Sequence, residues 1–319
     1  MAAEARGAVD AEAVSRAADI LRDESGDGVR EDFSLAPLTT FRIGGPAALY
    51  LEAQSERDLA AAGRAVRETA IPFVVLGKGS NVLVSDDGFP GLVLRLGRGF
   101  RWSERDGDLL RAGAAMPLPA LAGVALAQSL AGLEFGVAIP ATLGGAVRMN
   151  AGAHGHSIDE VVDSVELFSL SARETRTVPA AEAGFVYRRS ALPEDGVVVA
   201  ATTRLRPGDQ PGIRELMGEA RDWRRATQPL AEPNCGSVFK NPPDGHAASL
   251  IESLGAKGMS VGRATVSDKH ANFIVTAPGA RAADVVDLIR RLQDMVADRY
   301  GVRLEPEVRL VGPFDVAPH

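Results

Sequence analysis

The sequence predicts an α+β protein of two or three domains. At 319 residues the chain is longer than one compact core usually supports, and its 45% hydrophobic content allows each domain to bury its own interior. Before residue 100, strand-like segments alternate with a helical pattern, whereas later the chain carries amphipathic helical patterns near 213–220 and 285–296. A linker-like run of proline and glycine at 207–212 precedes the first of these helices and marks a domain boundary.

Composition excludes several classes of protein. The formal net charge of −7 and the pI of about 5.4 argue against a general nucleic-acid binder, which needs a basic surface. The single cysteine, Cys235, excludes an intramolecular disulfide framework and predicts a buried free thiol in a reducing compartment. Residues 1–30 lack the apolar core of a secretory signal, and no apolar stretch reaches membrane-spanning length. We therefore expect a cytoplasmic protein that binds neither nucleic acid nor membrane, with a weakly ordered leader over 1–30 in which residues 11–23 form a short helix.

Residues 31–96 predict a small α/β unit. A strand at 48–52 is followed by Ser55 and Asp58 at the spacing of a capping box, and then by apolar residues that recur at helical spacing. A buried strand is expected at 71–76.

A glycine loop, Gly77-Lys78-Gly79-Ser80-Asn81, follows that strand and leads into a second one at Val82–Val84. It is not a Rossmann turn, because no third glycine and no helix follow, and it is not a nucleotidase phosphate loop, because no Ser or Thr directly follows the lysine. Successive amides flanked by glycines can still form an anion nest, to which Ser80 and Asn81 add donors. The loop therefore predicts a site for a diphosphate.

A second glycine-rich segment spans 132–155, after a helix predicted at 117–130. Glycine costs backbone entropy, and a chain tolerates so many where its backbone must approach a flat cofactor or a diphosphate closely. Tight turns between short strands remain an alternative explanation. His154 and His156 have no carboxylate or cysteine cluster beside them, so we expect no metal site.

The run Cys235-Gly236-Ser237-Val238-Phe239-Lys240-Asn241-Pro242 predicts a loop that presents Ser237 and Lys240 to a common ligand. An ordinary polar surface loop is the alternative. Near the C-terminus the sequence predicts a helix with one buried face and Gly301 as its C-cap. A strand with alternating apolar and charged residues is expected to follow over 302–310. Its polar face would carry four charged residues, Arg303, Glu305, Glu307 and Arg309.

These motifs, taken in order, resemble the UDP-N-acetylenolpyruvoylglucosamine reductase (UDP-N-acetylmuramate dehydrogenase) family of flavin-dependent enzymes. The resemblance covers nearly everything after residue 31, in the segments 39–45, 76–81, 132–155, 185–190, 227–229, 235–242, 266–275 and 304–312. It implies a two-lobed FAD-binding domain of the vanillyl-alcohol-oxidase-like type over 31–208, with lobes at 31–96 and 97–208. A smaller α+β substrate-binding domain would occupy 209–319.

The resemblance also implies an activity and its residues. The family uses NADPH and non-covalent FAD to reduce the enolpyruvyl group of UDP-N-acetylglucosamine enolpyruvate, which gives UDP-N-acetylmuramate for peptidoglycan precursor synthesis, and we expect a monomer. The implied catalytic residues are Arg188, Ser237 and Glu307. The implied cofactor-binding residues are Gly77, Lys78, Gly79, Ser80, Asn81, Gly144, Gly145, Asn150, Ala151 and Gly152. The implied substrate-binding residues are Tyr187, Lys240, Asn241, Lys257 and Lys269.

Two other functions stay open at this point. One is an FAD-dependent oxidase or dehydrogenase of the same cofactor fold on another small molecule, with His154 as the candidate for covalent flavin attachment. The other is a non-catalytic flavin-binding module, because Ala138 and Ala141 replace glycines that are usual in the family and would be strained at positive φ. Three further departures are Ala256 and Arg263, both expected on the substrate side, and Thr276.

Overall fold

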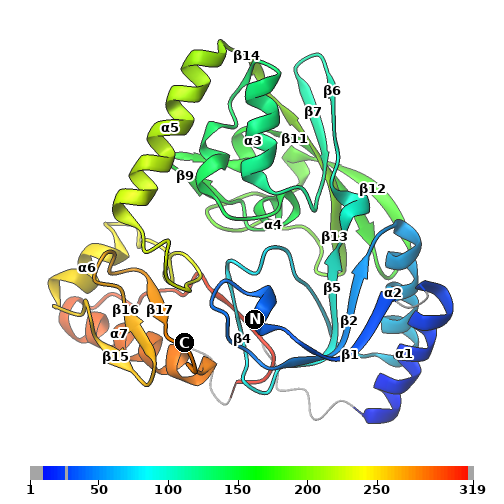
Figure 1. The fold of residues 1–319 in the computed structure, drawn as a ribbon, viewed down its shortest axis with the longest axis horizontal. Helices are drawn as coiled ribbons and strands as arrows, with labels where there is room; N and C mark the ends of the chain where they lie inside the picture. Colours follow the sequence, from blue (N-terminus) through cyan, green and yellow to red (C-terminus); the bar gives the residue numbers. More distant parts are fainter. Residues whose placement is uncertain (1–9, 26–27, 315–319) are drawn as a thin grey trace.

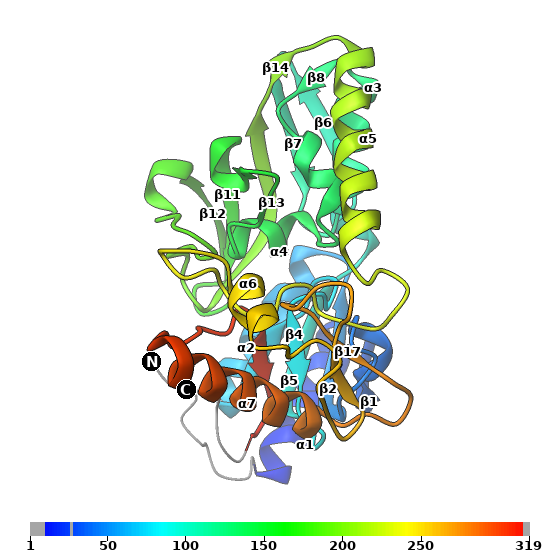
Figure 2. The same ribbon diagram turned by 90° about the vertical axis from the view of Figure 1, so that its left-hand side faces the viewer.

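The computed structural model describes residues 10–25 and 28–314, and these form three parts around a central space (Figure 1). The first lobe lies at the lower right of Figure 1, the second lobe at the top, and the C-terminal part at the lower left. Figure 2 shows the second lobe standing above the other two parts. No helix within 10–25 and 28–314 is both long and apolar enough to cross a membrane.

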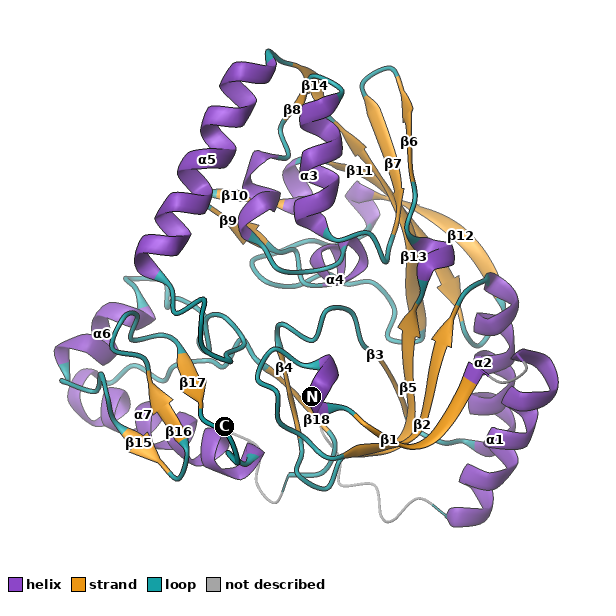
Figure 3. Cartoon of the chain, in the orientation of Figure 1, coloured by secondary structure: helices purple, strands orange, loops and turns teal. Residues whose placement is uncertain are grey.

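The first lobe is a four-stranded sheet covered by two helices (Figure 3). Only its first pair of strands is antiparallel. The strand order is β1 (Val29–Ser34), β2 (Pro46–Ala53), β5 (Phe89–Leu96) and β3 (Phe73–Val75). The helices are α1 (Ala11–Ser25) and α2 (Glu56–Thr69).

Helix α1 belongs to the core of this lobe. Its side chains Ala17, Ala18 and Leu21 are fully buried against α2 and the sheet. The predicted helix at 11–23 is therefore confirmed, but the expectation of a weakly ordered leader does not hold for residues 10–25, because burial of this apolar stripe fixes the helix. Residues 1–9 and 26–27 of the predicted leader lie outside the described residues.

In the first lobe, the prediction that rests on a helix cap is confirmed, whereas the prediction that depends on the position of a strand in the sheet is wrong. The capping box of α2 is present, since the Ser55 amide donates to the Asp58 carboxylate at 3.0 Å. The strand predicted as buried at 71–76 is β3, an edge strand whose Val75 side chain is 39% exposed. The prediction of a buried strand is wrong because an edge strand has a neighbour on one side only.

The second lobe is a five-stranded antiparallel sheet with helices packed on it (Figure 2). The strand order is β12 (Glu174–Pro179), β11 (Val162–Ser169), β13 (Gly196–Arg204), β7 (Leu109–Gly113) and β6 (Ser103–Asp106). The helices include α3 (Leu118–Ala127) and α4 (Leu143–Arg148). The helix predicted at 117–130 ends at Ala127, because Leu130–Ala131 form β8 and pair with β14 (Arg206–Pro207).

Helix α5 (Gln210–Thr227) begins at the predicted linker, where the Asp209 side chain accepts a hydrogen bond from the Gly212 amide at 2.8 Å. Its buried residues Ile213 and Met217 join the core of the second lobe. The amphipathic pattern near 213–220 also predicts a buried Leu216, and this prediction is wrong, since Leu216 is 51% exposed beside that stripe. The domain limits 31–208 and 209–319 remain predictions, but α5 packs on the lobe that precedes it.

The C-terminal part contains a small antiparallel sheet and two helices (Figure 3). The strands are β15 (Ser260–Val261), β16 (Ala264–Val266) and β17 (Ile274–Thr276), and the helices are α6 (Ala247–Ser253) and α7 (Ala282–Tyr300). The predicted apolar face of α7 is confirmed by Val285, Leu288, Ile289, Leu292 and Val296, all buried. Gly301 follows the helix at φ +67°, as its predicted role as a helix terminator requires.

The chain then returns to the first lobe. Only β18 (Arg309–Val311) forms a strand there, and it pairs in parallel with β4 (Val82–Val84) directly after the glycine loop. The prediction of a continuous strand over 302–310 is wrong, because the backbone before β18 bonds to the loop around Ser237 instead of to a sheet. This path brings the C-terminal segment between the two lobes (Figure 3).

Asp86 joins the first lobe to the C-terminal part. Its two carboxylate oxygens accept hydrogen bonds from the amides of Ala282 at 2.8 Å and Ala283 at 3.1 Å, at the first turn of α7. We expect Asp86→Ala to lower the free energy of unfolding by about 1–2 kcal/mol, because two helix amides lose their acceptor and the helix dipole loses an anion. Urea unfolding measures this, with Asp87→Ala in the same turn as the matched control. Equal losses in both variants would contradict a capping role.

Candidate active site

A cavity of about 1720 Å³ lies where the two lobes and the C-terminal part meet. The first lobe lines it with the glycine loop 77–81 and Thr40, and the second lobe with residues 138–142, Gly144, Gly145 and 151–153. Arg188, Ser237, Lys240 and Glu307 also line it. The structure therefore gathers both glycine-rich segments and all three predicted catalytic residues around one space.

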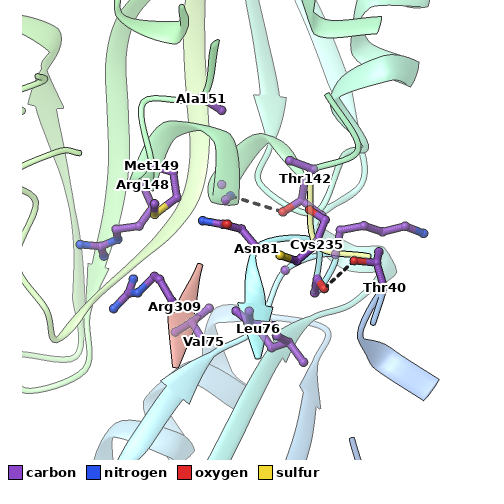
Figure 4. A pocket seen from close by; sticks show the side chains of 18 of the residues that line it. Thr40, Val75, Leu76, Asn81, Thr142, Arg148, Met149, Ala151, Cys235 and Arg309 are labelled. Atoms are coloured by element: carbon purple, nitrogen blue, oxygen red, sulfur yellow. Dashed lines mark hydrogen bonds between the residues drawn. The ribbon is translucent and has the colours of Figure 1, made fainter. Parts of the chain in front are cut away.

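Contacts with Leu38 and Thr40 fix the conformation of the glycine loop. Gly79 has φ +68°, and a Cβ atom there would lie 2.1 Å from the carbonyl oxygen of Leu38. The carbonyl oxygen of Gly79 accepts hydrogen bonds from the Thr40 amide at 3.0 Å and the Thr40 hydroxyl at 3.3 Å (Figure 4). Only glycine fits this conformation and this close approach without strain.

Asn81 connects the glycine loop to the C-terminal segment. Its side-chain amide donates to the carbonyl oxygen of Glu307 at 3.1 Å, and its own carbonyl accepts from the amide of Arg309 at 3.1 Å. Asn81 was predicted to bind the cofactor directly. That role remains a prediction, and Asn81 lines the cavity, while these two hydrogen bonds fix the backbone on both sides of Val308.

The second glycine-rich segment contains helix α4 and the short strand β9 (Gly152–Ala153). Thr142 is the N-cap of α4, and its hydroxyl accepts from the Gly145 amide at 3.3 Å (Figure 4). A Cβ atom on Gly144 would lie 2.9 Å from that of Ala114, so this glycine serves helix packing. Neither Ala138 nor Ala141 has positive φ, so the strain expected from the two alanines is absent.

The Ser237 loop is anchored from the C-terminal part. Asn272 accepts from the Val238 amide through its carbonyl, at 2.9 Å, and from the Phe239 amide through its side chain, also at 2.9 Å. Ser237 is half-buried and faces the cavity, while Cys235 is buried beneath the loop. Burial, together with the charge of Glu307, raises the pKa of the Cys235 thiol, so the predicted inert thiol is what the structure shows.

Arg188 and Glu307 form the charged centre of the site. Nε of Arg188 lies 3.0 Å from Oε1 of Glu307, an ion pair whose direction is poor for a hydrogen bond, and Nη2 donates to the carbonyl oxygen of Gly152 at 3.0 Å. Arg188 has φ +57°, an uncommon conformation for a residue with a side chain. Burial raises the pKa of Glu307, and the nearby charges of Arg188 and Lys240 oppose that rise.

The neighbouring carboxylate, Glu305, differs in surroundings. An isolated bridge between Phe239 and Pro306 aligns the loop with the C-terminal segment, and Nζ of Lys240 lies 2.5 Å from Oε1 of Glu305. The Glu305 side chain is 70% exposed, whereas that of Glu307 is 16% exposed. The structure therefore separates the two acidic residues into a surface carboxylate and a cavity carboxylate.

Known proteins resemble the chain over most of its length. It is 47% identical over 297 residues to the UDP-N-acetylenolpyruvoylglucosamine reductase of Anaeromyxobacter sp. (strain Fw109-5), which covers 93% of this chain and 92% of that protein. The chain belongs to the UDP-N-acetylenolpyruvoylglucosamine reductase family. It is also 44% identical over 294 residues to the reductase 2 of Symbiobacterium thermophilum, with 92% and 94% of the two chains covered.

Family models and a solved structure agree with this membership. Residues 47–175 match the model described as "FAD binding domain", and residues 228–311 match that of the C-terminal domain of the reductase family. The crystal structure of the reductase from Thermus caldophilus superposes with a TM-score of 0.77 at 35% identity, covering 89% of this chain and 98% of that one. The predicted α+β fold with an FAD-binding domain followed by a smaller domain is confirmed.

Five residues predicted from the family motifs do not line the cavity. Asn150 is buried and bonds to the Val186 carbonyl, and the Asn241 side chain accepts from the Ala247 amide of α6. Lys257 pairs with Glu252, Lys269 donates to a carbonyl of α5, and Tyr187 is 53% exposed with the Arg188 guanidinium over its ring. Their binding roles remain predictions, and the contacts present here are structural.

The three further departures from the family pattern, Ala256, Arg263 and Thr276, lie outside the cavity lining. Ala256 is buried in the core of the C-terminal part, and Arg263 donates to the Pro278 carbonyl on the surface, so neither faces the site as expected. Thr276 is buried and donates to the Phe41 carbonyl at 2.8 Å. His154 is exposed against Trp223, outside the cavity lining, which gives no support to covalent flavin attachment.

Sequence reasoning missed several polar residues of the cavity. Thr40 and Thr142 hold the two glycine-rich segments, and Arg148 and Arg309 face the cavity from α4 and β18 (Figure 4). Arg224 of α5 is half-buried, and burial lowers the pKa of its guanidinium. The signals for the threonines were present, because Thr40 and Thr142 lie inside the segments 39–45 and 132–155 that carried the resemblance. Arg148 and Arg309 also lie inside such segments, but nothing local distinguishes them or Arg224 from surface arginines. Within the described ranges, no cluster of His, Cys, Asp or Glu is suited to hold a metal ion.

Proposed function

We propose that this chain is an NADPH-dependent flavoenzyme that reduces UDP-N-acetylglucosamine enolpyruvate to UDP-N-acetylmuramate. The observation that carries the proposal is the meeting of Ser237, Arg188 and Glu307 in one cavity bounded by two glycine-rich segments. Relatives that span nine-tenths of the chain carry the name of this activity. We also propose that the protein acts as a monomer in the cytoplasm, where NADPH and nucleotide sugars are available.

The residues present fit non-covalent FAD. The cavity is large enough for a dinucleotide, and a Cβ atom on Gly77 would lie 2.8 Å from the Thr142 hydroxyl, so the two segments leave a narrow cradle that a side chain would fill. Residues 77–81 would hold the diphosphate, and residues 144–152 would lie along the rest of the cofactor. Flavin, when bound, accepts hydride from NADPH and delivers it to the substrate double bond.

The side chains of the site suit the demands of the second half-reaction. Hydride added at the β-carbon of an enolpyruvyl ether drives negative charge onto the α-carbon and its carboxylate. Ser237 is placed to give its hydroxyl proton to that carbon, because a carbanion of this kind is a strong enough base to take it. Arg188 stays charged at any working pH, and its planar fork matches the substrate carboxylate.

Glu307 assists from beside Arg188. Its carboxylate holds the guanidinium on the cavity side, and its raised pKa reflects a dehydrated setting in which its charge acts strongly on nearby groups. Lys240 adds a cation for the substrate on the same loop as Ser237. Tyr187, Asn241, Lys257 and Lys269 lie outside the cavity lining, and they remain proposed substrate contacts on the family motifs alone.

Anaerobic mixing tests the proposal. The purified protein should be yellow, should release its flavin on denaturation, and should lose flavin absorbance faster with NADPH than with NADH. Adding the enolpyruvyl nucleotide should then restore that absorbance. A colourless protein that does not take up added FAD would overturn the proposed function, and bleaching without restoration would favour an oxidoreductase of another substrate.

Gly79 offers a test of the cofactor cradle. Gly79→Ala should abolish or greatly weaken FAD binding, because positive φ costs roughly 1–2 kcal/mol and the new Cβ collides with the Leu38 carbonyl, so the loop must move. Gly107→Ala is the matched control, since Gly107 also has positive φ, at +58°, but a Cβ there meets nothing within 4 Å. Flavin fluorescence titration compares them. Equal FAD affinity in the two variants would mean that the loop does not hold the cofactor.

A further inference from the structure

Two arginine side chains extend toward the same side of the cavity (Figure 4). Arg148 is the last residue of α4 in the second lobe, and Arg309 is the first residue of β18. The Arg309 backbone bonds to Asn81, but its guanidinium has no ion-pair or hydrogen-bond partner among the side chains and carbonyls that the structure describes. Arg309 is therefore a free cation at the cavity wall.

Arg148 is fixed in place without being neutralised. Its Nη1 donates to the carbonyl oxygens of Leu192 at 2.8 Å and Pro193 at 2.9 Å, and its Nη2 donates to that of Gly196. These acceptors are neutral. Burial, and then the like charge of Arg309, lower the pKa of Arg148, which shows that the two guanidinium groups oppose each other.

Two acidic residues also lie near Arg148, and both line the cavity. Asp195 accepts hydrogen bonds from the hydroxyls of Ser169 at 2.9 Å and Ser171 at 2.6 Å, which fix its carboxylate on the second lobe. Glu194 is exposed. Each of the two raises the pKa of Arg148 by less than Arg309 lowers it. An anion that binds between the two guanidinium groups would relieve the repulsion between them.

The Arg309 backbone lies beside the glycine loop. Arg309 is paired in register with Val82, the residue after the loop, and its amide donates to Asn81 at 3.1 Å. Residues 77–81 and both arginines line the same cavity. Amide nests and arginine forks are the two groups that proteins most often use for phosphate oxygens.

We propose that Arg148 and Arg309 bind the diphosphate of FAD against residues 77–81, so that β18 is part of the cofactor site. The inference rests on the proposed function, because it takes FAD as the cofactor. NADPH and the nucleotide-sugar substrate also carry diphosphates, and the adjacency to the glycine loop favours FAD among the three. Since Glu307 precedes Arg309 by two residues, the same segment carries the carboxylate of the reacting centre and a cation of the cofactor site.

Flavin affinity tests the inference in the full-length chain stripped of flavin. Arg309→Gln should weaken FAD binding roughly 10- to 100-fold, the effect of one lost charge-assisted hydrogen bond, and should leave riboflavin, which has no phosphate, within about 2-fold of wild type. Added salt should weaken FAD binding less in Arg309→Gln than in wild type. Arg206→Gln, which removes one exposed cation from β14, is the matched control.

Arg148→Lys is the second variant, because it keeps the charge but cannot reach all three carbonyls. It should also lose FAD affinity more than riboflavin affinity. Two results for Arg309→Gln would overturn the inference, provided that the wild-type protein binds FAD. One is an equal loss of affinity for FAD and for riboflavin, and the other is an FAD affinity equal to that of wild type. A raised KM for NADPH or for the nucleotide sugar with unchanged FAD affinity would assign the two arginines to that diphosphate instead. Failure of the wild-type chain to bind FAD would overturn the proposed function itself.

Discussion

Replacing Ser237 with alanine should separate the two half-reactions. NADPH should bleach the flavin absorbance at nearly the wild-type rate, because Ser237 has no part in hydride transfer from NADPH. Return of the absorbance on adding the enolpyruvyl nucleotide should slow by roughly two to four powers of ten, the usual scale for loss of a proton-transfer group. Ser237 lines the cavity, and its loop is anchored by Asn272, so the substitution should leave the loop in place.

Stopped-flow absorbance under anaerobic conditions measures both rates. Ser260→Ala, an exposed serine of β15 outside the cavity lining, is the matched control and should leave both unchanged. Ser237→Cys should recover part of the lost rate if proton donation is the role, because a thiol is more acidic than a hydroxyl. Wild-type return of absorbance in Ser237→Ala would remove Ser237 from the mechanism.

Elements with strong local signals could be predicted from the sequence. The capping box of α2, the apolar face of α7 and the strand-to-strand glycine loop all depend on residues within a few positions of one another. The packing of α1 was not predictable with the same certainty. Its apolar stripe is visible in the sequence, but whether a partner helix covers it depends on α2, which follows two intervening strands, β1 and β2.

Features decided by distant segments were missed. The exposure of β3 follows from its place at the sheet edge, and the interruption of the strand before β18 follows from bonds to the Ser237 loop. The same bonds separate Glu307 from Glu305. In sequence both belong to one alternating charged face, and only the pairing of Phe239 with Pro306 turns one carboxylate into the cavity and leaves the other in solvent.

The candidate site was assembled from family motifs, and the structure selects among them. Ser237, Arg188 and Glu307 converge, whereas Asn150 and Asn241 are occupied by backbone groups. A family motif contains residues that build a loop and residues that contact a ligand. The position of a residue in the motif does not show to which of these two groups it belongs. Arg148 and Arg309 show the converse case, because both lie inside segments that carried the resemblance, 132–155 and 304–312, and line the cavity, yet no binding role was predicted for them.

Glu307→Gln should slow the second half-reaction and stabilise the protein at the same time. Absorbance return should fall roughly 10- to 1000-fold, because Arg188 loses the charge that holds it at the cavity and the reacting centre loses an electrostatic partner. Reduction by NADPH should change little. Glu305→Gln is the matched control. Because the Glu305 side chain is 70% exposed, this substitution should leave both rates unchanged.

The stability effect follows from the sign of the pKa shift. Burial raises the pKa of Glu307 in the folded protein, so the protonated form contributes stability below the unfolded pKa, and that stability is lost as pH rises through the folded pKa. Glutamine mimics the protonated form at every pH. The free energy of unfolding of Glu307→Gln should therefore exceed that of wild type at pH 8 and approach it near pH 4, as measured by urea unfolding. A Glu307→Gln variant less stable than wild type at pH 8 would mean that the ion pair with Arg188 outweighs the cost of burial. Slower absorbance return in Glu305→Gln would assign the catalytic role to Glu305 instead.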